Sequence, residues 1–258
     1  MSSEANIHPA AAAGFARHTD KYVSGRPDYP SAIDGWLRDA LQLGQGKAVA
    51  DLGAGTGKFL PRLQSTGARI IAIEPVAAMR SQLSQRFPHV DVQEGTAERM
   101  PLDNDSVDAV VCAQAFHWFA NPRAVQEIRR VLKPGGALGL IWNIREENVD
   151  WAAELTRILD VHEGQTPRFS SGAWRQMFPA PGFSELVETS FPHSHTGPPQ
   201  QVIVDRLMSV SFIAALPPQQ QQQVLDEIHA LIARTPVLAA PTVSMPYRTY
   251  AFCCRKLD

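Results

Sequence analysis

The sequence has few of the features that mark secreted, disulfide-stabilised or membrane proteins. It holds three cysteines, Cys112, Cys253 and Cys254, with no C-x-x-C spacing, which argues against a disulfide framework or a zinc site and favours a reducing, cytoplasmic environment. No run approaches the roughly 18 apolar residues of a membrane helix, and the N-terminus does not resemble a signal peptide. We therefore expect no membrane partner, no bound metal and a disordered segment over residues 1–14.

An excess of charge of either sign is also absent. The formal net charge is -2 and charged residues make up 19% of the chain, so no general attraction to nucleic acid is expected. Hydrophobic residues make up 44% of the 258 residues, as in ordinary globular proteins. This length fits a single domain, which we predict over residues 15–258.

Strand-like and helix-like patterns alternate between Ser31 and Asn143. This alternation predicts a parallel sheet with helices on both faces. Ser31, with Asp34 three residues later, predicts a capping box at a first helix, and Asn121-Pro122 predicts a later helix start. Strands are predicted at 48–52, 69–74, 90–93, 107–112 and 137–142. Helices are predicted at 58–64, 76–86 and from Pro122 to the stop at Pro134-Gly135-Gly136.

The remaining sequence is less regular. It predicts helices at 150–162, 171–178, 201–208 and 218–234, strands at 183–191 and 243–254, and a loop at 192–199. We expect a cofactor-binding core at about 31–143, helices that cover the site at about 150–180 and 199–234, and a final strand at about 243–255. His193 and His195 are spaced like metal ligands on a strand, but without a cysteine or acidic cluster the loop interpretation is favoured.

The most informative stretch runs from Lys47 to Leu60, KAVADLGAGTGKFL. A buried strand ends in Asp51 and three glycines at alternate positions, so that a ligand can lie against bare main chain. Glu74 ends the next strand and is placed to accept hydrogen bonds from ribose hydroxyls. A dinucleotide fingerprint needs a small residue where Lys58 stands, so this pattern favours a nucleoside cofactor without a pyrophosphate over a dehydrogenase cofactor.

The motifs around this loop resemble those of class I S-adenosylmethionine-dependent methyltransferases with a type 11 methyltransferase domain. They occur in the family's order from about Tyr22 to Asn143. The resemblance implies a Rossmann-like, doubly wound α/β fold with a mostly parallel seven-stranded sheet, an antiparallel last strand and added helices over the site. The segments that carry it are VADLGAGTG at 49–57, Ile71–Glu74, Glu94–Glu98 with Pro101-Leu102, Ser106-Val107-Asp108 and Leu132–Gly136.

The resemblance also implies roles for individual residues. Tyr22 and Arg26 would fold over the cofactor, and the segments RPDYP at 26–30 and AQAFHWF at 113–119 are similar to trans-aconitate-type and related small-molecule enzymes. Met79 fits either an adenine contact or plain core packing, and Thr96 stands where relatives often carry Asp. The residues predicted to bind S-adenosyl-L-methionine are Tyr22, Arg26, Asp51, Gly53, Gly55, Glu74, Met79, Thr96, Ala97, Glu98, Gln114 and Ala115.

On the acceptor side, His117, Trp118 and Arg145 are the predicted residues. His117 would act as a base for a hydroxyl or ring nitrogen, or would serve only to shape the pocket. Arg145 would pair with an anionic substrate, or would be a solvated loop charge. The expected reaction is in-line methyl transfer to an oxygen or nitrogen of a small molecule such as a carboxylate or heterocycle. RNA or protein methylation and a non-catalytic S-adenosylmethionine-binding role stay open, as do monomer and homodimer.

Overall fold

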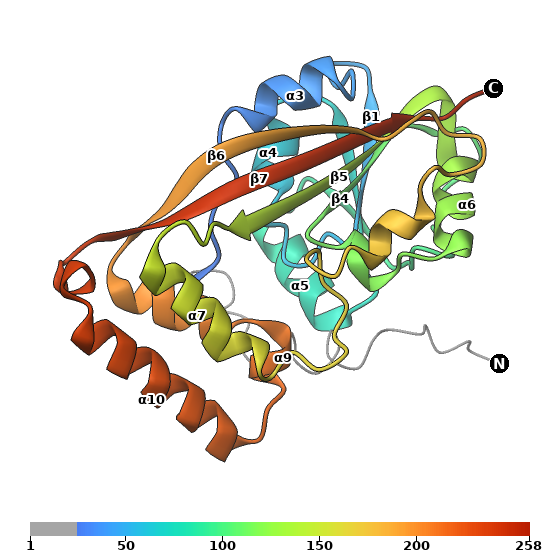
Figure 1. Cartoon of the computed structure of the whole chain (residues 1–258). Coiled ribbons are helices and arrows are strands. Elements are labelled where there is room, and N and C mark those ends of the chain that lie inside the picture. The colour runs from blue at the N-terminus through green and yellow to red at the C-terminus, as the bar shows by residue number, and fades with distance from the viewer. Residues whose placement is uncertain (1–24) are drawn as a thin grey trace.

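The computed structural model describes residues 25–258; the predictions for Tyr22 and for residues 1–14 lie outside this range. Seven strands form one sheet in the order β3-β2-β1-β4-β5-β7-β6 (Figure 1). Neighbouring strands from β3 to β5 are parallel, whereas β7 runs antiparallel to both β5 and β6. The predicted doubly wound, mostly parallel seven-stranded sheet is thereby confirmed.

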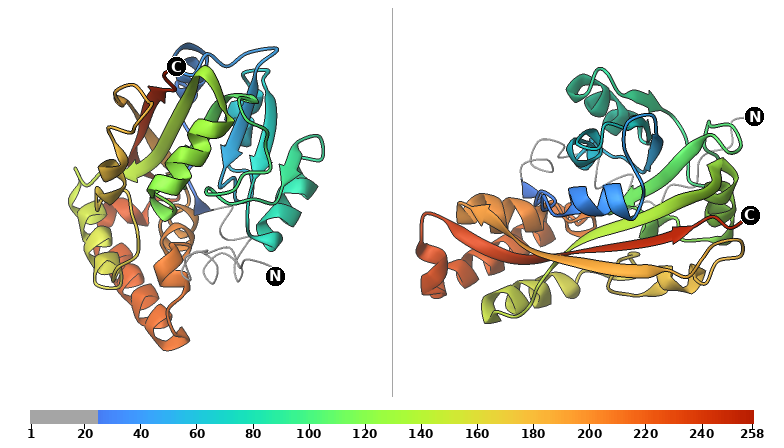
Figure 2. Two further views of the ribbon diagram at one scale, coloured as in Figure 1. Left: turned by 90° about the vertical axis from the view of Figure 1, so that its right-hand side faces the viewer. Right: turned by 90° about the horizontal axis from the view of Figure 1, so that it is seen from above.

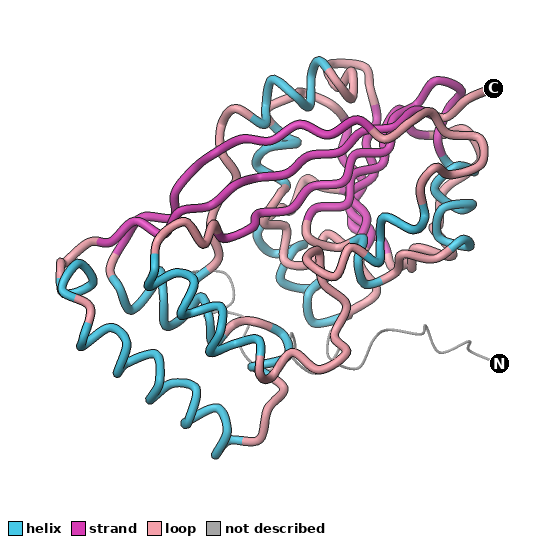
Figure 3. The backbone as a smooth tube through the Cα atoms, viewed as in Figure 1, coloured by secondary structure: helices cyan, strands magenta, loops and turns pink. Residues whose placement is uncertain are grey.

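The strands of the sheet differ in length. β1, β2 and β4 are short and largely buried, as expected for strands covered on both faces, and β3 is a short, more exposed edge strand. β5, β6 and β7 extend beyond them toward α7 and α10 (Figures 1 and 3). The bounds are β1 Ala48–Leu52, β2 Arg69–Ile73, β3 Asp91–Gln93, β4 Val107–Ala113, β5 Leu132–Arg145, β6 Val187–Gly197 and β7 Val243–Arg255.

Helices cover both faces of the parallel part of the sheet. Three of them, α3 Ile33–Asp39, α4 Leu60–Gln64 and α5 Ala77–Arg86, pack on one face through Leu37, Leu63 and Leu83. On the other face lie α6 Pro122–Val131 and the short 3-10 helix η2 Ala173–Met177. The Asn121 side chain accepts a hydrogen bond from the Ala124 backbone N–H, so the predicted cap of α6 is confirmed.

A separate group of helices packs over the extended ends of β5–β7 (Figure 2). Its members share one apolar cluster with the start of β7, which forms because their buried residues recur at helical spacing. We call this group the cap. It comprises α7 Asp150–Asp160, the π-helix η3 Gln200–Asp205, α8 Arg206–Met208, α9 Ser211–Ala214, α10 Pro218–Arg234 and the 3-10 helix η4 Pro236–Ala239.

Two local predictions for the core are wrong. Ser31 does not cap α3, because the Asp34 N–H donates to the Ser31 carbonyl in a backbone turn and the Asp34 carboxylate pairs with Arg62 at 3.1 Å. The helix α6 does not run on to Pro134-Gly135-Gly136; it ends at Val131, and Leu132 already pairs with Val107 as the first residue of β5. The predicted helix at 58–64 begins at Leu60.

The C-terminal half needs larger corrections. The predicted loop at 192–199 is mostly strand, since β6 runs to Gly197 and pairs with β7 along its whole length. The inward-facing positions of β6 include Phe191, His193 and His195. Exposed and less exposed residues therefore alternate along the strand, but the inward residues are too polar for the sequence pattern to predict a strand. Pro192 is tolerated because β6 is an edge strand. The predicted helix at 171–178 is the 3-10 turn η2, and its Trp174 belongs to the sheet core.

Candidate active site

The glycine loop after β1 depends on residues without a side chain at two positions, Gly53 and Gly55. Gly53 has φ +74° and Gly55 has φ +57°, in the left-handed region that favours glycine. A Cβ built on Gly53 would lie 2.8 Å from the Cβ of Ala115, which follows β4. The Gly53 N–H donates to the Ile73 carbonyl at 2.8 Å. These contacts bring the ends of β1, β2 and β4 together around bare main chain, as the sequence predicts.

The Glu74 carboxylate fixes the loop from the end of β2. Its two oxygens accept hydrogen bonds from the backbone N–H groups of Gly55 and Val76, both at 2.9 Å. Burial raises the pKa of Glu74, and the two N–H donors and Arg80 oppose that rise. Each carboxylate oxygen keeps a lone pair for a further donor, so Glu74 has the chemistry to accept hydroxyl groups.

Asp51 is buried without a hydrogen-bond partner. Its side chain is 1% exposed, and neither carboxylate oxygen has a donor among the described residues. Burial, together with the charge of Glu74, raises the pKa of Asp51 to about 7. An unpartnered buried carboxylate is costly, so this group is suited to a cationic ligand that restores its charge.

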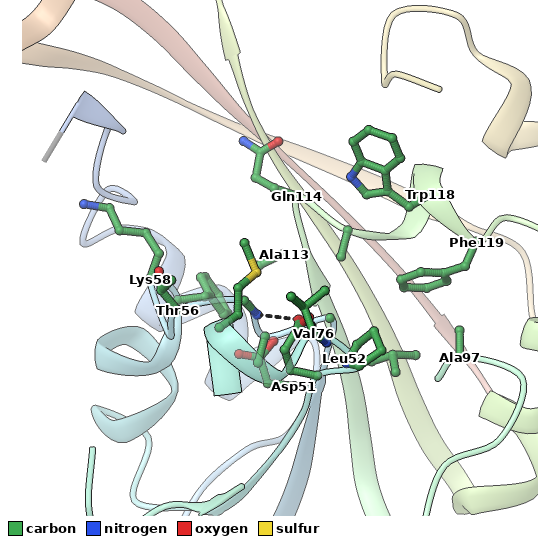
Figure 4. Close-up of a pocket in the computed structure, with 18 of the residues that line it drawn as sticks. Asp51, Leu52, Thr56, Lys58, Val76, Ala97, Ala113, Gln114, Trp118 and Phe119 are labelled. Carbon is green, nitrogen blue, oxygen red and sulfur yellow. Dashed lines mark hydrogen bonds between the residues drawn. The ribbon is translucent and has the colours of Figure 1, made fainter. Parts of the chain in front are cut away.

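These groups line one cavity of about 400 Å³ at the carboxyl ends of the parallel strands. Figure 4 shows Asp51 and Val76 on one side of it, with Gln114 and Trp118 across from them. Met79 is both buried and part of the wall. The predicted residues that line this cavity are Arg26, Asp51, Gly53, Gly55, Glu74, Met79, Thr96, Ala97, Glu98, Gln114, Ala115 and Trp118.

The far wall carries a strained residue. Gln114 has φ +57°, which is uncommon for a residue other than glycine and which clusters at functional sites. Its side chain donates to the Asn143 carbonyl at 3.0 Å, which fixes the amide at the cavity wall. Trp118 and Phe119 add aromatic surface there (Figure 4). Phe116, in the same segment 113–119, does not line the cavity and is fully buried in the sheet core.

His117 lies beside the cavity and is not part of its lining. Its ring packs against Trp118, and the Trp142 indole N–H donates to its Nδ1 at 3.0 Å. An indole can only donate, so neutral His117 carries its proton on Nε2. Burial, with the charges of Arg26 and Arg168, lowers the pKa of His117 to about 3. The side chain is therefore a neutral hydrogen-bond donor at neutral pH, which does not favour the role of a base.

Arg145 ends β5 and also lies beyond the cavity lining. Its Nη2 donates to Thr156 Oγ1 in α7 at 2.6 Å, so it contacts the cap and is not a solvated loop charge. Burial lowers its pKa, and the charges of Arg206 and Arg168 act in the same direction while Tyr247 and Glu147 oppose them.

Sequence reasoning missed several residues that line the cavity. Lys58, which served only to exclude a dinucleotide fingerprint, pairs with Asp28 at 2.5 Å. Asn143 donates to the Asp28 carbonyl at 3.3 Å, and Arg206 reaches the cavity from the cap. The position of Asn143 at a strand end was the one available signal. Arg206 gave none, because no local motif surrounds it.

Other site chemistries find no support in the described residues. From Gly25 to Asp258, no group of three or more His, Cys, Asp or Glu side chains is arranged to hold a metal ion. Within the same range, the helices are too short or too polar to cross a membrane. Cys112 is fully buried in β4, and burial raises the pKa of its thiol well above the usual value, so it is a core residue.

Comparison with known proteins agrees with this geometry. Residues 50–140 match the model of a methyltransferase domain. A methyltransferase-like protein of Schizosaccharomyces pombe is 39% identical over 94% of this chain and 95% of its own length, and a methyltransferase of Mycobacterium tuberculosis is 37% identical over 91% and 92%. The YcgJ protein of Bacillus subtilis shares the fold, with a TM-score of 0.57 over 89% of this chain and 100% of its own, at 19% identity. The chain belongs to the class I S-adenosylmethionine-dependent methyltransferases with a type 11 methyltransferase domain.

Proposed function

We propose that this methyltransferase transfers the methyl group of S-adenosylmethionine to an oxygen or nitrogen atom of a small molecule, with carboxylates and heterocycles as the favoured acceptor classes. The observation that carries this proposal is the cavity of about 400 Å³ between the glycine loop and the Arg26–Tyr29 segment. Its size is in the range of small-molecule sites, about 300–1,000 Å³. A formal net charge of -2 does not favour RNA as the acceptor.

The residues present fit the cofactor. Glu74 would hold the ribose hydroxyls, because its oxygens keep free lone pairs at the cavity. Asp51, unpartnered beside the glycine loop, would face the cationic part of the cofactor. Met79, Thr96, Ala97 and Glu98 would border the adenine, with Arg26, Gln114 and Ala115 at the methionine end. Tyr22 and the trans-aconitate-type specificity stay predictions.

When bound, S-adenosylmethionine supplies a methyl group on a sulfonium, which is already a good leaving group. The protein's part is then to orient the acceptor in line with that methyl group and to exclude water. Orientation can lower such barriers by up to about 7–11 kcal/mol in the best model systems. The rigid Gln114 and the aromatic surface of Trp118 and Phe119 are suited to this task, and an aromatic face also attracts a cation.

The cofactor class can be tested by thermal unfolding of the full chain with S-adenosylmethionine, with S-adenosylhomocysteine and with NAD. Each ligand that binds should stabilise the protein by about 2.7 kcal/mol at a hundred times its dissociation constant. Transfer of a labelled methyl group to small acids, phenols and heterocycles, with RNA as control, then tests the acceptor class. Stabilisation by NAD alone, or label found only in RNA, would refute the proposal.

His117→Ala is expected to lower turnover while S-adenosylmethionine binding persists. The loss should be much smaller than the roughly 10²–10⁴-fold that removal of a general base costs. Because the pKa of His117 is about 3, the ratio of wild-type to variant rates should stay constant from about pH 5.5 to pH 8, where an ordinary histidine titrates. Rate profiles of the two proteins check this; a limb near pH 6.5 lost in the variant would restore His117 as a base.

A further inference from the structure

Arg206 is a half-buried cation whose guanidinium forms no ion pair with the described residues. It opens α8 directly after the π-helix η3, a kind of helix that occurs frequently at functional sites, and it lines the cavity. Its Nε and Nη1 are buried and have no hydrogen-bond partner among the described residues. Gly25 packs on the backbone of Arg206, since a Cβ built on Gly25 would lie 2.8 Å from the Arg206 backbone nitrogen. Arg206 is therefore held at the boundary between the cap and the cavity.

A second group of polar atoms without partners lies on the sheet, close enough to Arg206 for its charge to lower the pKa of Arg145. Arg145 is the cross-strand neighbour of Tyr247, so both side chains are on the same face of the sheet. The Nε of Arg145 and the hydroxyl of Tyr247 are buried without a partner in the described chain, and Tyr247 is only 1% exposed. Asn143, two residues before Arg145 on that face, lines the cavity. This face therefore leads from the cavity to the underside of the cap.

Two nearby cations form ion pairs, whereas Arg145 and Arg206 form none with the described residues. Arg168 pairs with Asp160 at 3.1 Å and with Glu163 at 2.6 Å, and Lys58 pairs with Asp28. In the described chain, the guanidinium groups of Arg145 and Arg206 form no ion pair within 4.0 Å. A buried charge without a counter-charge lowers the free energy of unfolding. Within residues 25–258, the protein supplies no carboxylate within ion-pair distance of these two guanidinium groups, so a bound ligand is suited to supply one.

We propose that Arg206 and Arg145, with the Tyr247 hydroxyl beside them, hold a carboxylate of the methyl acceptor. This inference rests on the proposed function, and it narrows the acceptor to an organic acid. Planar guanidinium groups match the geometry of a carboxylate and form strong charge-assisted hydrogen bonds with it. The three side chains come from α8, β5 and β7, so their arrangement fixes the orientation of the acid as well as its charge.

The carboxylate that the arginines hold is not the group that receives the methyl. Two guanidinium groups and a hydroxyl would occupy its lone pairs and withdraw its charge, which makes it a poor nucleophile. The acceptor therefore carries a second group, which attacks from the wall formed by Gln114 and Trp118. An acid with two functional groups satisfies both ends of the site; a molecule with one neutral hydroxyl does not.

The test uses the full chain saturated with S-adenosylhomocysteine, with succinate, glutarate and citrate as probes and their methyl esters as neutral partners. Calorimetry and thermal unfolding should detect binding of at least one acid and weaker or no binding of its ester. Arg206→Gln should weaken acid binding at least about tenfold, the loss of one charge-assisted hydrogen bond, whereas Arg206→Lys should keep part of it. Tyr247→Phe, which preserves the ring, should weaken acid binding severalfold.

The matched control is Arg234→Gln, an exposed arginine of α10 that pairs with Glu154, and it should bind the acids like the wild type. The dissociation constant of S-adenosylmethionine should stay within about twofold in Arg206→Gln. If that constant rises tenfold instead, the arginine holds the cofactor's own carboxylate and the proposal fails. The proposal also fails if the methyl esters bind as tightly as the acids, or if no probe acid binds. The acid titrations are repeated on protein without cofactor. Failure of the wild-type protein to bind S-adenosylmethionine would therefore refute the proposed function separately from the proposal about the acid.

Discussion

Glu74→Ala is expected to weaken S-adenosylmethionine binding by at least about 100-fold. The carboxylate accepts the Gly55 and Val76 N–H groups at 2.9 Å and would accept the ribose hydroxyls on its remaining lone pairs. Hydrogen bonds to a charged group contribute about 1.5–3 kcal/mol each. Loss of the two bonds to the ribose hydroxyls would therefore weaken the binding free energy of the cofactor by about 3–6 kcal/mol. Calorimetric titration with S-adenosylmethionine measures the change directly.

The same substitution should also lower the stability of the unliganded protein. It leaves two loop N–H groups without their acceptor, at a cost of about 1–3 kcal/mol in urea unfolding. Glu74→Gln keeps the shape and one carbonyl oxygen, so it should bind the cofactor more tightly than the alanine variant. Glu227→Gln removes an exposed charge on α10 and serves as control. Cofactor affinity within about threefold of wild type in Glu74→Ala would contradict the role of Glu74.

Asp51→Asn should make the unliganded protein more stable above pH 7 and should weaken cofactor binding there. The pKa of Asp51 is raised from 3.8 to about 7 in the folded state. A raised pKa means that this group favours folding below about pH 4 and loses that contribution as pH rises through 7, by about 4 kcal/mol in total. Asparagine has no charge to bury, so this decline with pH should be absent in the variant.

The wild-type protein should couple cofactor binding to proton release. A cationic ligand near Asp51 favours the ionised carboxylate, so affinity for S-adenosylmethionine should fall as pH decreases from about 8 to 6, and binding below pH 7 should release up to one proton. Calorimetry in buffers with different ionisation enthalpies counts that proton, and Asp51→Asn should release none. If wild type and variant show the same pH dependence, Asp51 does not sense the cofactor charge.

Most of the donor side could be predicted from the sequence because its signals are local. The strand 48–52, its terminal Asp51 and the spaced glycines are contiguous, and Glu74 ends the next strand, so parallel topology alone brings them together. Asn121-Pro122 gave the start of α6 for the same reason. By contrast, the Ser31 capping box failed because a distant residue, Arg62, takes the Asp34 carboxylate.

Long-range packing decided what the sequence did not reveal. The second half of β6, residues 192–197, was predicted as a loop because its inward positions include His193 and His195, and only pairing with β7 makes this polar alternation a strand. Trp142 determines the tautomer of His117 from a different strand.

The sequence by itself determined the fold class, the methyl-donor cofactor and most of the predicted residues that line the cavity. Short motifs at strand ends indicate each of these features. Only the tertiary structure brought together the residues that we propose for the acceptor side. Arg206, Arg145 and Tyr247 are far apart along the chain, and they meet because β7 pairs with β5 and the cap packs over both. Arg145 could be predicted from its position at the end of the fifth strand, whereas no local pattern marks Arg206 or Tyr247, and the three side chains form a group only after folding.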